Sequence, residues 1–353
     1  MNGCALTNLG FVLKKENVSC KRSVDGYPVN NKEITMYKKF VVVSRFPRGM
    51  GFGNKLFLWS RAIIFARKNG FQFVEPIWFS LRISFLKKSI YNLPSFFRQI
   101  ALLGVLKKRK SDLAWWRYPV FYIFLKHINE QDSIEEPCFE KNGICIFRKP
   151  ITNFTQFSEE RTYLKSCIYE IARPKWIKLI EKHIAFSNNA IGVNIRAGLD
   201  FPDAIHATDW ETKGPLRTPV LWFANLIKCI RTKIGYQVPV LLISDGNHNY
   251  LNEIIILENV VFVQPGCAVS DLLLLSGCKI LLGSGGSSFS AWASFLGSIP
   301  TITHYGSHLK WYGLNSTPNH YVSTTNRDGS VPEEFLKIAA RLFKEPVCGS
   351  LKL

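Results

Sequence analysis

The chain has 353 residues, 47% of them hydrophobic, so it is long enough for two domains of ordinary size and too apolar for a disordered protein. Its formal net charge of +19 predicts attraction to polyanions such as nucleic acid, anionic lipid or a phosphate-rich substrate. Nine scattered cysteines without a C-x-x-C spacing favour neither a disulfide framework nor a zinc site, and the expected location is cytoplasmic.

Residues 1–35 are polar, lack clear periodicity and precede the first convincing strand. We expect either that Met36 is the true start or that 1–35 form a dispensable, disordered leader. This stretch lacks a basic segment followed by an apolar core, and no run of about 18 apolar residues occurs anywhere in the chain. The sequence therefore predicts a protein that is neither exported nor membrane-spanning.

A strand, a glycine-rich loop, a helix and a second strand are predicted near the start of an N-terminal domain over 36–150. The β-branched run Phe40–Ser44 predicts a buried strand, and Phe71–Val74 predicts the next one. Between them, Asn54 is expected to cap an apolar helix that ends at Asn69-Gly70. This βαβ order indicates a parallel sheet.

The stretch Leu81–Lys126 carries ten Lys and Arg against one acidic residue, Asp112, and interleaves them with aromatic residues such as Trp115 and Trp116. Basic and aromatic residues together suit an anionic membrane interface, which predicts a peripheral contact through 81–126 at the inner face of the membrane. A helical insertion with a solvated basic face fits the same pattern, and the sequence does not separate the two.

Strands and helices alternate more plainly in the second half, where a C-terminal domain is expected over 187–330, after a linker region, 151–186, and before a tail helix in 331–353. Strands are predicted at Ala190–Ile195, Val238–Ser244, Val260–Val263, Lys279–Leu282 and Thr301–Thr303, and helices at Pro219–Thr232, His248–Leu257, Ser270–Cys278 and Ser287–Leu296. The predicted fold class is α/β, with two Rossmann-like domains facing each other across a cleft.

This two-domain architecture, termed GT-B, is that of one large class of sugar-nucleotide-dependent glycosyltransferases. Its sheets bind ligands beyond the carboxyl ends of their strands, where the unusual residues of this sequence fall. The first motif there is Gly49-Met50-Gly51-Phe52-Gly53-Asn54, whose glycines permit close backbone approach before a helix start that offers N–H groups to an anion. It matches neither the dinucleotide fingerprint nor the P-loop, so a simple turn and a phosphate site both fit it.

Arg196 leaves the carboxyl end of the strand Ala190–Ile195, beside Asn194, and its guanidinium is suited to clamp a phosphate through two hydrogen bonds. The alternative is a salt bridge across the domain interface. Asp245 follows the strand Val238–Ser244 and offers two acceptor oxygens to guanine or ribose, although Asp-Gly is also a common turn.

A second glycine-rich loop connects the strand Lys279–Leu282 to a helix. Its residues of interest are Ser284, Gly286, Ser287, Ser288 and Phe289. Backbone N–H groups, hydroxyls and a helix dipole converge there, an arrangement suited to a pyrophosphate. The alternative is a serine N-cap after a turn, but two glycines and three serines exceed what a cap requires.

Together, the segments GMGFGNKLF, VNIRAG, LLISDG and DLLLLSGCKILLGSGGSSFSAWASFLG resemble, in order and spacing, the motifs of the bacterial and animal α-1,2-fucosyltransferases of glycosyltransferase family 11. The family pattern is G-x-G-N-Q-L-F, H-I-R-R-G-D, a strand ending in S-D-D, and M-S-x-C-x-x-x-I-x-x-N-S-S-F-S-W-W. The match covers roughly Val41–Phe73 and Ile191–Thr303. Residues 81–186 carry no motif of the family.

Several family positions differ in this chain, whereas Asn54, Arg196 and Asp245 are kept. The differing positions are Lys55 (Gln in the family), Asn194 (His), Ala197 (Arg), Gly246 (Asp) and Gly285-Gly286 (Asn-Ser), and Leu199 intrudes before Asp200. The resemblance therefore implies nucleoside-diphosphate binding ahead of fucose as the sugar.

By this resemblance, the expected reaction is an inverting, metal-independent displacement in which an acceptor hydroxyl attacks the anomeric carbon of a GDP-sugar, with GDP-fucose favoured and no cofactor. The implied catalytic residues are Arg196, Asp200 and Asn54, and the implied donor-binding residues are Gly51, Gly53, Asn194, Asp245, Ser284, Gly286, Ser287, Ser288 and Phe289. Arg196 and the serine-loop N–H groups would stabilise the leaving diphosphate. Asp200 is the expected base, and Asp203, His206 and Asp209 lie in the same loop.

The expected acceptor is an oligosaccharide or lipid-linked glycan in surface polysaccharide or lipopolysaccharide synthesis. One alternative is a catalytically drifted relative that still binds sugar nucleotides. Another is a basic nucleic-acid-binding protein, for which the charge of +19 is the main support. The location of that charge argues against nucleic acid, because much of it lies in 81–126 while the sheet loops suit a nucleoside diphosphate.

Overall fold

The structure, a computed structural model, describes residues 40–47, 50–78, 106–129, 143–198, 201–206, 209–213, 216–264, 266–306, 309–316 and 320–344. All of them belong to one compact unit, Lys39–Leu353. The predicted leader, residues 1–35, and residues 81–105 of the predicted membrane contact lie outside the described residues.

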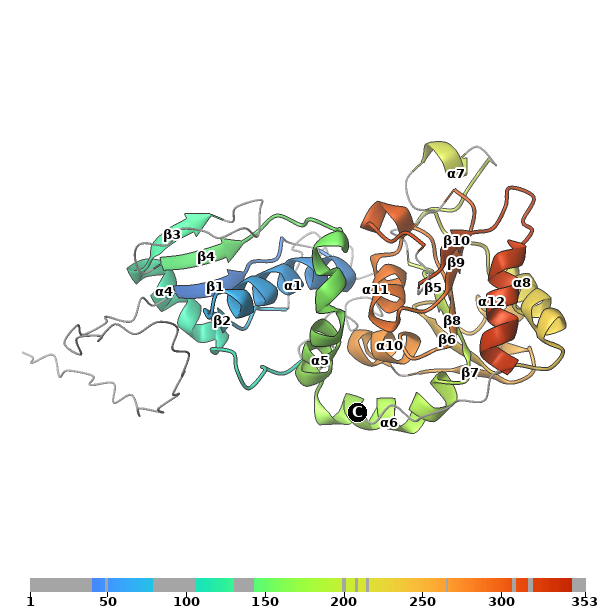
Figure 1. Cartoon of the computed structure of the whole chain (residues 1–353), viewed down its shortest axis with the longest axis horizontal. Coiled ribbons are helices and arrows are strands. Elements are labelled where there is room, and N and C mark those ends of the chain that lie inside the picture. The colour runs from blue at the N-terminus through green and yellow to red at the C-terminus, as the bar shows by residue number, and fades with distance from the viewer. Residues whose placement is uncertain are drawn as a thin grey trace, which may run out of the picture. The chain divides into compact units, whose positions relative to one another are not determined.

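Two sheets of parallel strands organise the described residues (Figure 1). The strands are β1 (Phe40–Ser44), β2 (Gln72–Val74), β3 (Lys126–Asn129), β4 (Gly143–Phe147), β5 (Ile191–Ile195), β6 (Val240–Ser244), β7 (Val260–Phe262), β8 (Ile280–Gly283), β9 (Thr301–Thr303) and β10 (Val322–Thr324). The first sheet has the order β2-β1-β4-β3 and the second the order β10-β9-β8-β5-β6-β7, with every neighbouring pair parallel. This topology confirms the predicted α/β class.

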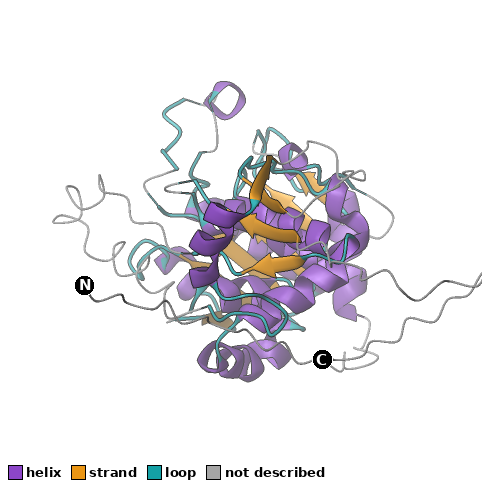
Figure 2. Cartoon of the chain, turned by 90° about the vertical axis from the view of Figure 1, so that its left-hand side faces the viewer, coloured by secondary structure: helices purple, strands orange, loops and turns teal. Residues whose placement is uncertain are grey.

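Helices lie on both sides of the strands (Figure 2). They are α1 (Phe52–Lys68), α4 (Tyr118–Phe124), α5 (Arg161–Ile171), α6 (Pro174–Ser187), α7 (Asp209–Thr212), α8 (Val220–Ile234), α9 (Asn252–Ile255), α10 (Ala268–Leu275), α11 (Ser288–Gly297) and α12 (Glu333–Lys344), with the 3₁₀ turns η2 (Trp115–Arg117), η3 (Thr155–Glu160) and η4 (Leu309–Tyr312). In the part of the chain that the structure describes, no helix is long and apolar enough to cross a membrane.

Both faces of the first sheet are covered, because successive side chains of a strand point to opposite faces. Val42 and Cys145 pack in one cluster with α1. Val41 and Ile144 pack in another, against side chains of α4 and its flanking residues. Burial on both faces accounts for the continuous apolar run of β1, which lacks the alternation of a half-exposed strand.

The second sheet is sandwiched in the same way. In β6, Leu241 and Ile243 belong to the cluster that includes α6, α10 and α11, whereas Val240 and Leu242 belong to the cluster of α8, α9 and α12. In β5, Gly192 lies under α10, and a Cβ atom there would lie 2.9 Å from Cys278 Sγ. The glycine therefore permits the close approach of the helix to the sheet.

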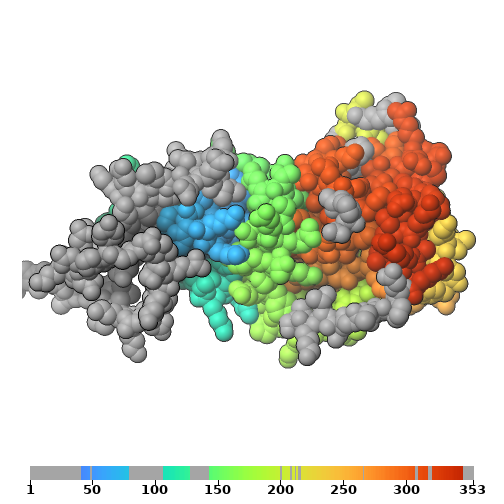
Figure 3. Space-filling view, viewed as in Figure 1, coloured from blue at the N-terminus to red at the C-terminus, as the bar shows by residue number. Residues whose placement is uncertain are grey.

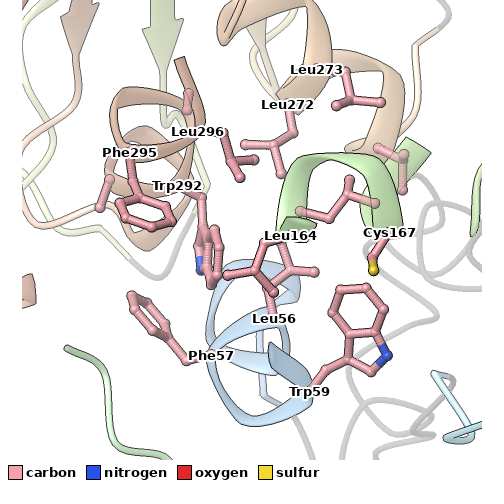
Figure 4. Close-up of a cluster of buried hydrophobic side chains, with 14 of the residues drawn as sticks. Leu56, Phe57, Trp59, Leu164, Cys167, Leu272, Leu273, Trp292, Phe295 and Leu296 are labelled. Carbon is pink, nitrogen blue, oxygen red and sulfur yellow. The ribbon is translucent and has the colours of Figure 1, made fainter. Parts of the chain in front are cut away.

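One hydrophobic cluster joins the inner faces of the two sheets, and in Figure 4 side chains of α1, α5, α10 and α11 point toward one another. The ring centroid of Phe57 in α1 lies 4.9 Å from that of Trp292 in α11 and 4.6 Å from that of Phe154. Residues 151–186, the predicted linker region, contribute α5 and α6 to this cluster. In Figure 3, green residues accordingly lie between the blue and the orange parts of the chain.

Three strands, β3, β4 and β10, are absent from the sequence prediction. β3 begins with Lys126 and His127 and is an edge strand, so it lacks a strong apolar pattern. The short apolar run of β4 is not separable from a helix by periodicity alone. Conversely, the helix predicted over His248–Leu257 is reduced to the single turn α9.

Candidate functional site

Three loops lie side by side at the carboxyl edge of the second sheet, because β8, β5 and β6 are adjacent and parallel. Ser284, Arg196 and Asp245 are the first residues after these three strands. The structure thus brings together three of the residues that the sequence predicts for the site.

Arg196 is held by groups of its own sheet. Its Nη1 donates to Asp245 Oδ2 over 2.7 Å, and its backbone N–H donates to Ser284 Oγ over 2.9 Å. The backbone N–H of Ala197 donates to Asp245 Oδ1 over 2.6 Å. The ion pair therefore lies within one sheet and not across the two sheets, in contrast to the salt bridge considered for Arg196. The side chain stays 31% exposed at the carboxyl edge.

The serine loop forms a tight turn into α11. Gly286 adopts the left-handed region with φ +67°, and its carbonyl oxygen accepts from the Tyr312 hydroxyl over 2.7 Å. Ser287 is the N-cap of α11, and its Oγ accepts from the Ser290 N–H over 3.3 Å. Phe289 is half-buried against the large core. The structure therefore realises the serine cap that the sequence left as an alternative, with Ser288 as the first helical residue.

The glycine loop leads into α1 with Gly51, not Asn54, as the N-cap. Gly51 is extended, with φ −64° and ψ 159°, and its carbonyl oxygen accepts from the Lys55 N–H over 3.0 Å. The prediction for Asn54 is wrong in this respect, because the helix begins at Phe52 and places Asn54 inside its first turn. A glycine cap has no side-chain oxygen, so α1 has no side-chain cap.

The two glycine-rich motifs are in direct contact. A Cβ atom added to Gly53 would lie 2.6 Å from Ser288 Oγ and 3.0 Å from the Ser288 carbonyl carbon, closer than van der Waals contact allows. The indole N–H of Trp292 donates to Gly53 O over 2.8 Å in the buried interior. The beginnings of α1 and α11 therefore meet, and glycine at position 53 is what allows it.

The electrostatics of this junction favour an anion. Neither α1 nor α11 has an acidic residue in its first turn. Each helix beginning carries a partial positive charge of about half an elementary charge. Arg196 adds a partly exposed guanidinium at the adjoining strand end, and its ion pair with Asp245 offsets part of that positive charge. This combination is suited to bind the phosphates of a nucleotide.

Asn194 and Asp245, two of the predicted donor-binding residues, are hydrogen-bonded within the site, and their contact with a donor stays a prediction. The Asn194 side chain is only 3% exposed, and its amide donates to Ser290 Oγ over 2.7 Å, beneath the serine loop. The Asp245 carboxylate accepts from the Arg196 guanidinium at Oδ2 and from the Ala197 backbone N–H at Oδ1. Both side chains therefore help to hold the loops of the site in place. The sequence alone could not show this role, because it does not reveal which residues they contact.

Two of the acidic residues near Arg196 in the sequence, Asp203 and Asp209, are engaged in ion pairs. Asp203 pairs with Arg217 over 3.1 Å. The pKa of Asp209 is lowered to about 2 by Lys213 and by the N–H groups of His206 and Ile205, which makes this carboxylate a weak base. Asp200 lies outside the described residues, so its role stays a prediction.

Three residues of the junction are absent from the predicted catalytic and donor-binding residues: Lys55, Trp292 and Tyr312. Lys55 is buried, its Nζ donates to Trp78 O over 2.5 Å, and burial lowers its pKa to about 8. Tyr312 comes from η4, and burial raises its pKa to about 12. Trp292 lies four residues after Ser288, on the same side of α11, and this spacing is a signal that could have revealed it.

Within the described ranges, no group of three or more His, Cys, Asp or Glu side chains is placed to hold a metal ion. The expectation of a metal-independent reaction stays a prediction.

No protein-family model and no curated protein matches the sequence. Solved structures with a similar chain path include POFUT1 in complex with GDP, at 12% identity and a TM-score of 0.42, covering 75% of this chain and 98% of that one. NodZ α-1,6-fucosyltransferase soaked with GDP-fucose has 18% identity and a TM-score of 0.44, with 76% and 95% covered. Fucosyltransferase NodZ from Bradyrhizobium has 18% identity and a TM-score of 0.45, with 76% and 94% covered.

Proposed function

We propose that the chain is an inverting glycosyltransferase that moves a sugar, with fucose favoured, from a GDP-sugar to a hydroxyl group of a glycan. The proposal is carried by the contact between Gly53 and Ser288 beside Arg196. This contact joins the two motifs best suited to phosphate, at the sheet edge where such folds bind nucleotides. The motif resemblance to α-1,2-fucosyltransferases supplies the choice of donor.

In this proposal the second sheet binds the donor. Arg196 and the backbone N–H groups at the start of α11 bind the diphosphate and stabilise the charge that develops on it as the sugar leaves. Asp245 and Ser284 orient Arg196: Asp245 accepts a hydrogen bond from its guanidinium, and Ser284 accepts one from its backbone N–H. This fixed orientation lowers the free-energy cost of organising the site during the reaction.

The first sheet supplies the acceptor side. Asn54 lies half-buried in the first turn of α1, next to Gly53 and hence close to Ser288. Its amide can donate to or accept from a sugar hydroxyl. Asp200 stays the proposed general base, because Asp203 and Asp209 are both engaged in ion pairs. An acceptor in surface polysaccharide or lipopolysaccharide synthesis, and a cytoplasmic location, are parts of the same proposal.

A ligand panel tests the proposal. The melting temperature of the full chain is measured with GDP, GDP-fucose, GDP-mannose and UDP-sugars, since a ligand that binds the folded state raises it. We expect GDP and its sugars to stabilise the protein and Arg196→Ala to abolish the shift. Arg67→Ala is the matched control, because Arg67 is half-exposed and pairs with Glu160 away from the junction.

The outcomes separate three functions. Release of GDP from one GDP-sugar in the presence of a glycan acceptor supports transfer. Stabilisation by GDP-sugars without any turnover would identify a catalytically drifted binding protein. Failure of every GDP compound to stabilise the chain, together with tight binding of single-stranded nucleic acid, would overturn the proposal.

A further inference from the structure

Helix α4 is apolar on two sides, and only one of these sides packs against the first sheet. Tyr118, Phe121 and Leu125, at positions i, i+3 and i+7, pack against the first sheet. Val120, Ile123 and Phe124 point away from it, with 51%, 73% and 78% of their surfaces exposed. A helix that buries one face on a sheet is normally polar on the other, so the outer face is unusual.

Two exposed tryptophans extend this outer face. Trp115 and Trp116 of the preceding turn η2 are 51% and 57% exposed. We call Trp115, Trp116, Val120, Ile123 and Phe124 the α4 outer face. Tryptophan is enriched where one side of a residue meets apolar material and the other meets water, as at a membrane interface.

Basic residues flank the α4 outer face along the chain, and we call the exposed ones beside α4 its basic rim. Between residues 106 and 129 the chain has six Lys and Arg and one acidic residue, Asp112, which is buried in an ion pair with Arg109. The rim consists of exposed Arg117 in η2 and exposed Lys126 at the start of β3, on either side of α4, whereas exposed Lys107 lies beside the end of α5, where its N–H donates to Ile171 O. Each such cation strengthens binding to an anionic bilayer surface by about fivefold.

The α4 outer face begins near the site-bearing edge of the first sheet. Leu113 forms a bridge with Val74, the last residue of β2, and η2 follows directly. Tyr118 interacts with Arg45 and Arg148, the residues that follow β1 and β4. The exposed tryptophans therefore belong to the end of the sheet from which the glycine loop emerges.

We propose that the α4 outer face and its basic rim dock the protein on the surface of an anionic lipid bilayer. The apolar side chains enter the headgroup region while the cations contact lipid phosphates. A second copy of the chain is the less suitable occupant, because a two-fold contact through this face would bring the same cations opposite one another. Docking needs no sugar donor, so the proposal stands independently of glycosyl transfer.

Vesicle co-sedimentation of the full chain tests this proposal. The probes are phosphatidylcholine vesicles with and without about 30% phosphatidylglycerol. We expect binding to the anionic vesicles that weakens as salt rises, because mobile ions screen the rim. Equal binding to both kinds of vesicle, or binding to neither, would overturn it.

Paired variants locate the surface. The double variant Ile123→Ser, Phe124→Ser should bind anionic vesicles about tenfold more weakly, because two large side chains no longer enter the bilayer. The control is Leu221→Ser, Ile256→Ser, which alters side chains that are 54% and 68% exposed beside the second sheet, and it should bind like the natural chain. Arg117→Gln should weaken binding about fivefold, and Lys228→Gln should not.

Two results contradict the assignment of this face. Equal vesicle binding by the Ile123→Ser, Phe124→Ser variant and the natural chain would place membrane contact elsewhere. A dimer in size-exclusion chromatography that this variant converts to a monomer, without vesicle binding by either protein, would identify a second copy as the occupant. Circular dichroism of each variant shows that a loss of binding is not a loss of folding.

Discussion

Trp292 of α11 donates its indole N–H to the carbonyl oxygen of Gly53 in α1 over 2.8 Å. The bond is buried, and Trp292 also packs against Phe57 of α1, so the first helix of one sheet is fixed to a helix of the other. This pairing sets the distance between the glycine loop and the serine loop.

Gly53→Ala should destabilise the protein and abolish GDP binding, because the new methyl group overlaps Ser288. Overpacking of this kind costs about 1–3 kcal/mol of unfolding free energy. Gly51→Ala is the control for unfolding only, since a Cβ there meets nothing within 4 Å and the φ of −64° suits any residue. Urea unfolding and GDP titration measure both effects. Equal behaviour of the two variants in urea unfolding would contradict the close contact.

Trp292→Phe should lower the unfolding free energy by about 1–3 kcal/mol, because the buried hydrogen bond to the Gly53 carbonyl is lost and the smaller ring leaves a cavity. Trp311→Phe is the control, since Trp311 is 51% exposed. Chemical denaturation measures the difference. An unchanged midpoint for Trp292→Phe would show that the hydrogen bond does not stabilise the junction.

Asp245→Asn should weaken GDP and UDP binding to a similar degree, about tenfold, because the neutral amide holds Arg196 less firmly. A direct contact between Asp245 and the base would instead weaken GDP selectively. Isothermal titration with both nucleotides distinguishes these roles. A loss confined to GDP would identify Asp245 as a base-contacting residue and contradict the positioning role.

Asn54→Ala should lower turnover while leaving GDP affinity within about twofold, because Asn54 is proposed to act on the acceptor. Arg196→Ala should reduce both quantities, since its cation serves bound and leaving diphosphate. Steady-state kinetics with the donor identified in the ligand panel, together with GDP titration, make the comparison. Equal losses of GDP affinity in the two variants would contradict this division.

Lys55 should make stability depend on pH. Burial lowers its pKa from 10.5 to about 8, so between these values the unfolded chain keeps a proton that the folded chain has released. The unfolding free energy should therefore rise with pH across this interval, by about 3 kcal/mol relative to Lys55→Met, which has no titrating group. Urea unfolding of both proteins across the interval measures it. Parallel pH profiles would show that Lys55 has an ordinary pKa.

The sequence predicted much of the second sheet because each element is encoded in contiguous residues. The apolar runs of β5, β6 and β8 and the glycines after β8 identified strand ends without any knowledge of partners. β3 was not predictable in this way, since an edge strand beginning with Lys126 has no apolar signal of its own. The N-cap of α1 was misassigned because a glycine cap leaves no side-chain signature.

By itself, the sequence determined that Ser284, Arg196 and Asp245 would each stand near the end of a strand, because periodicity and turn chemistry are local. Only the tertiary structure decided that Asp245 holds Arg196 across 49 positions and that Trp292 binds Gly53 across 239. It also decided that Asn194 lies beneath the serine loop. Contacts between such distant residues depend on how sheets and helices pack, and no short pattern in the chain records that packing.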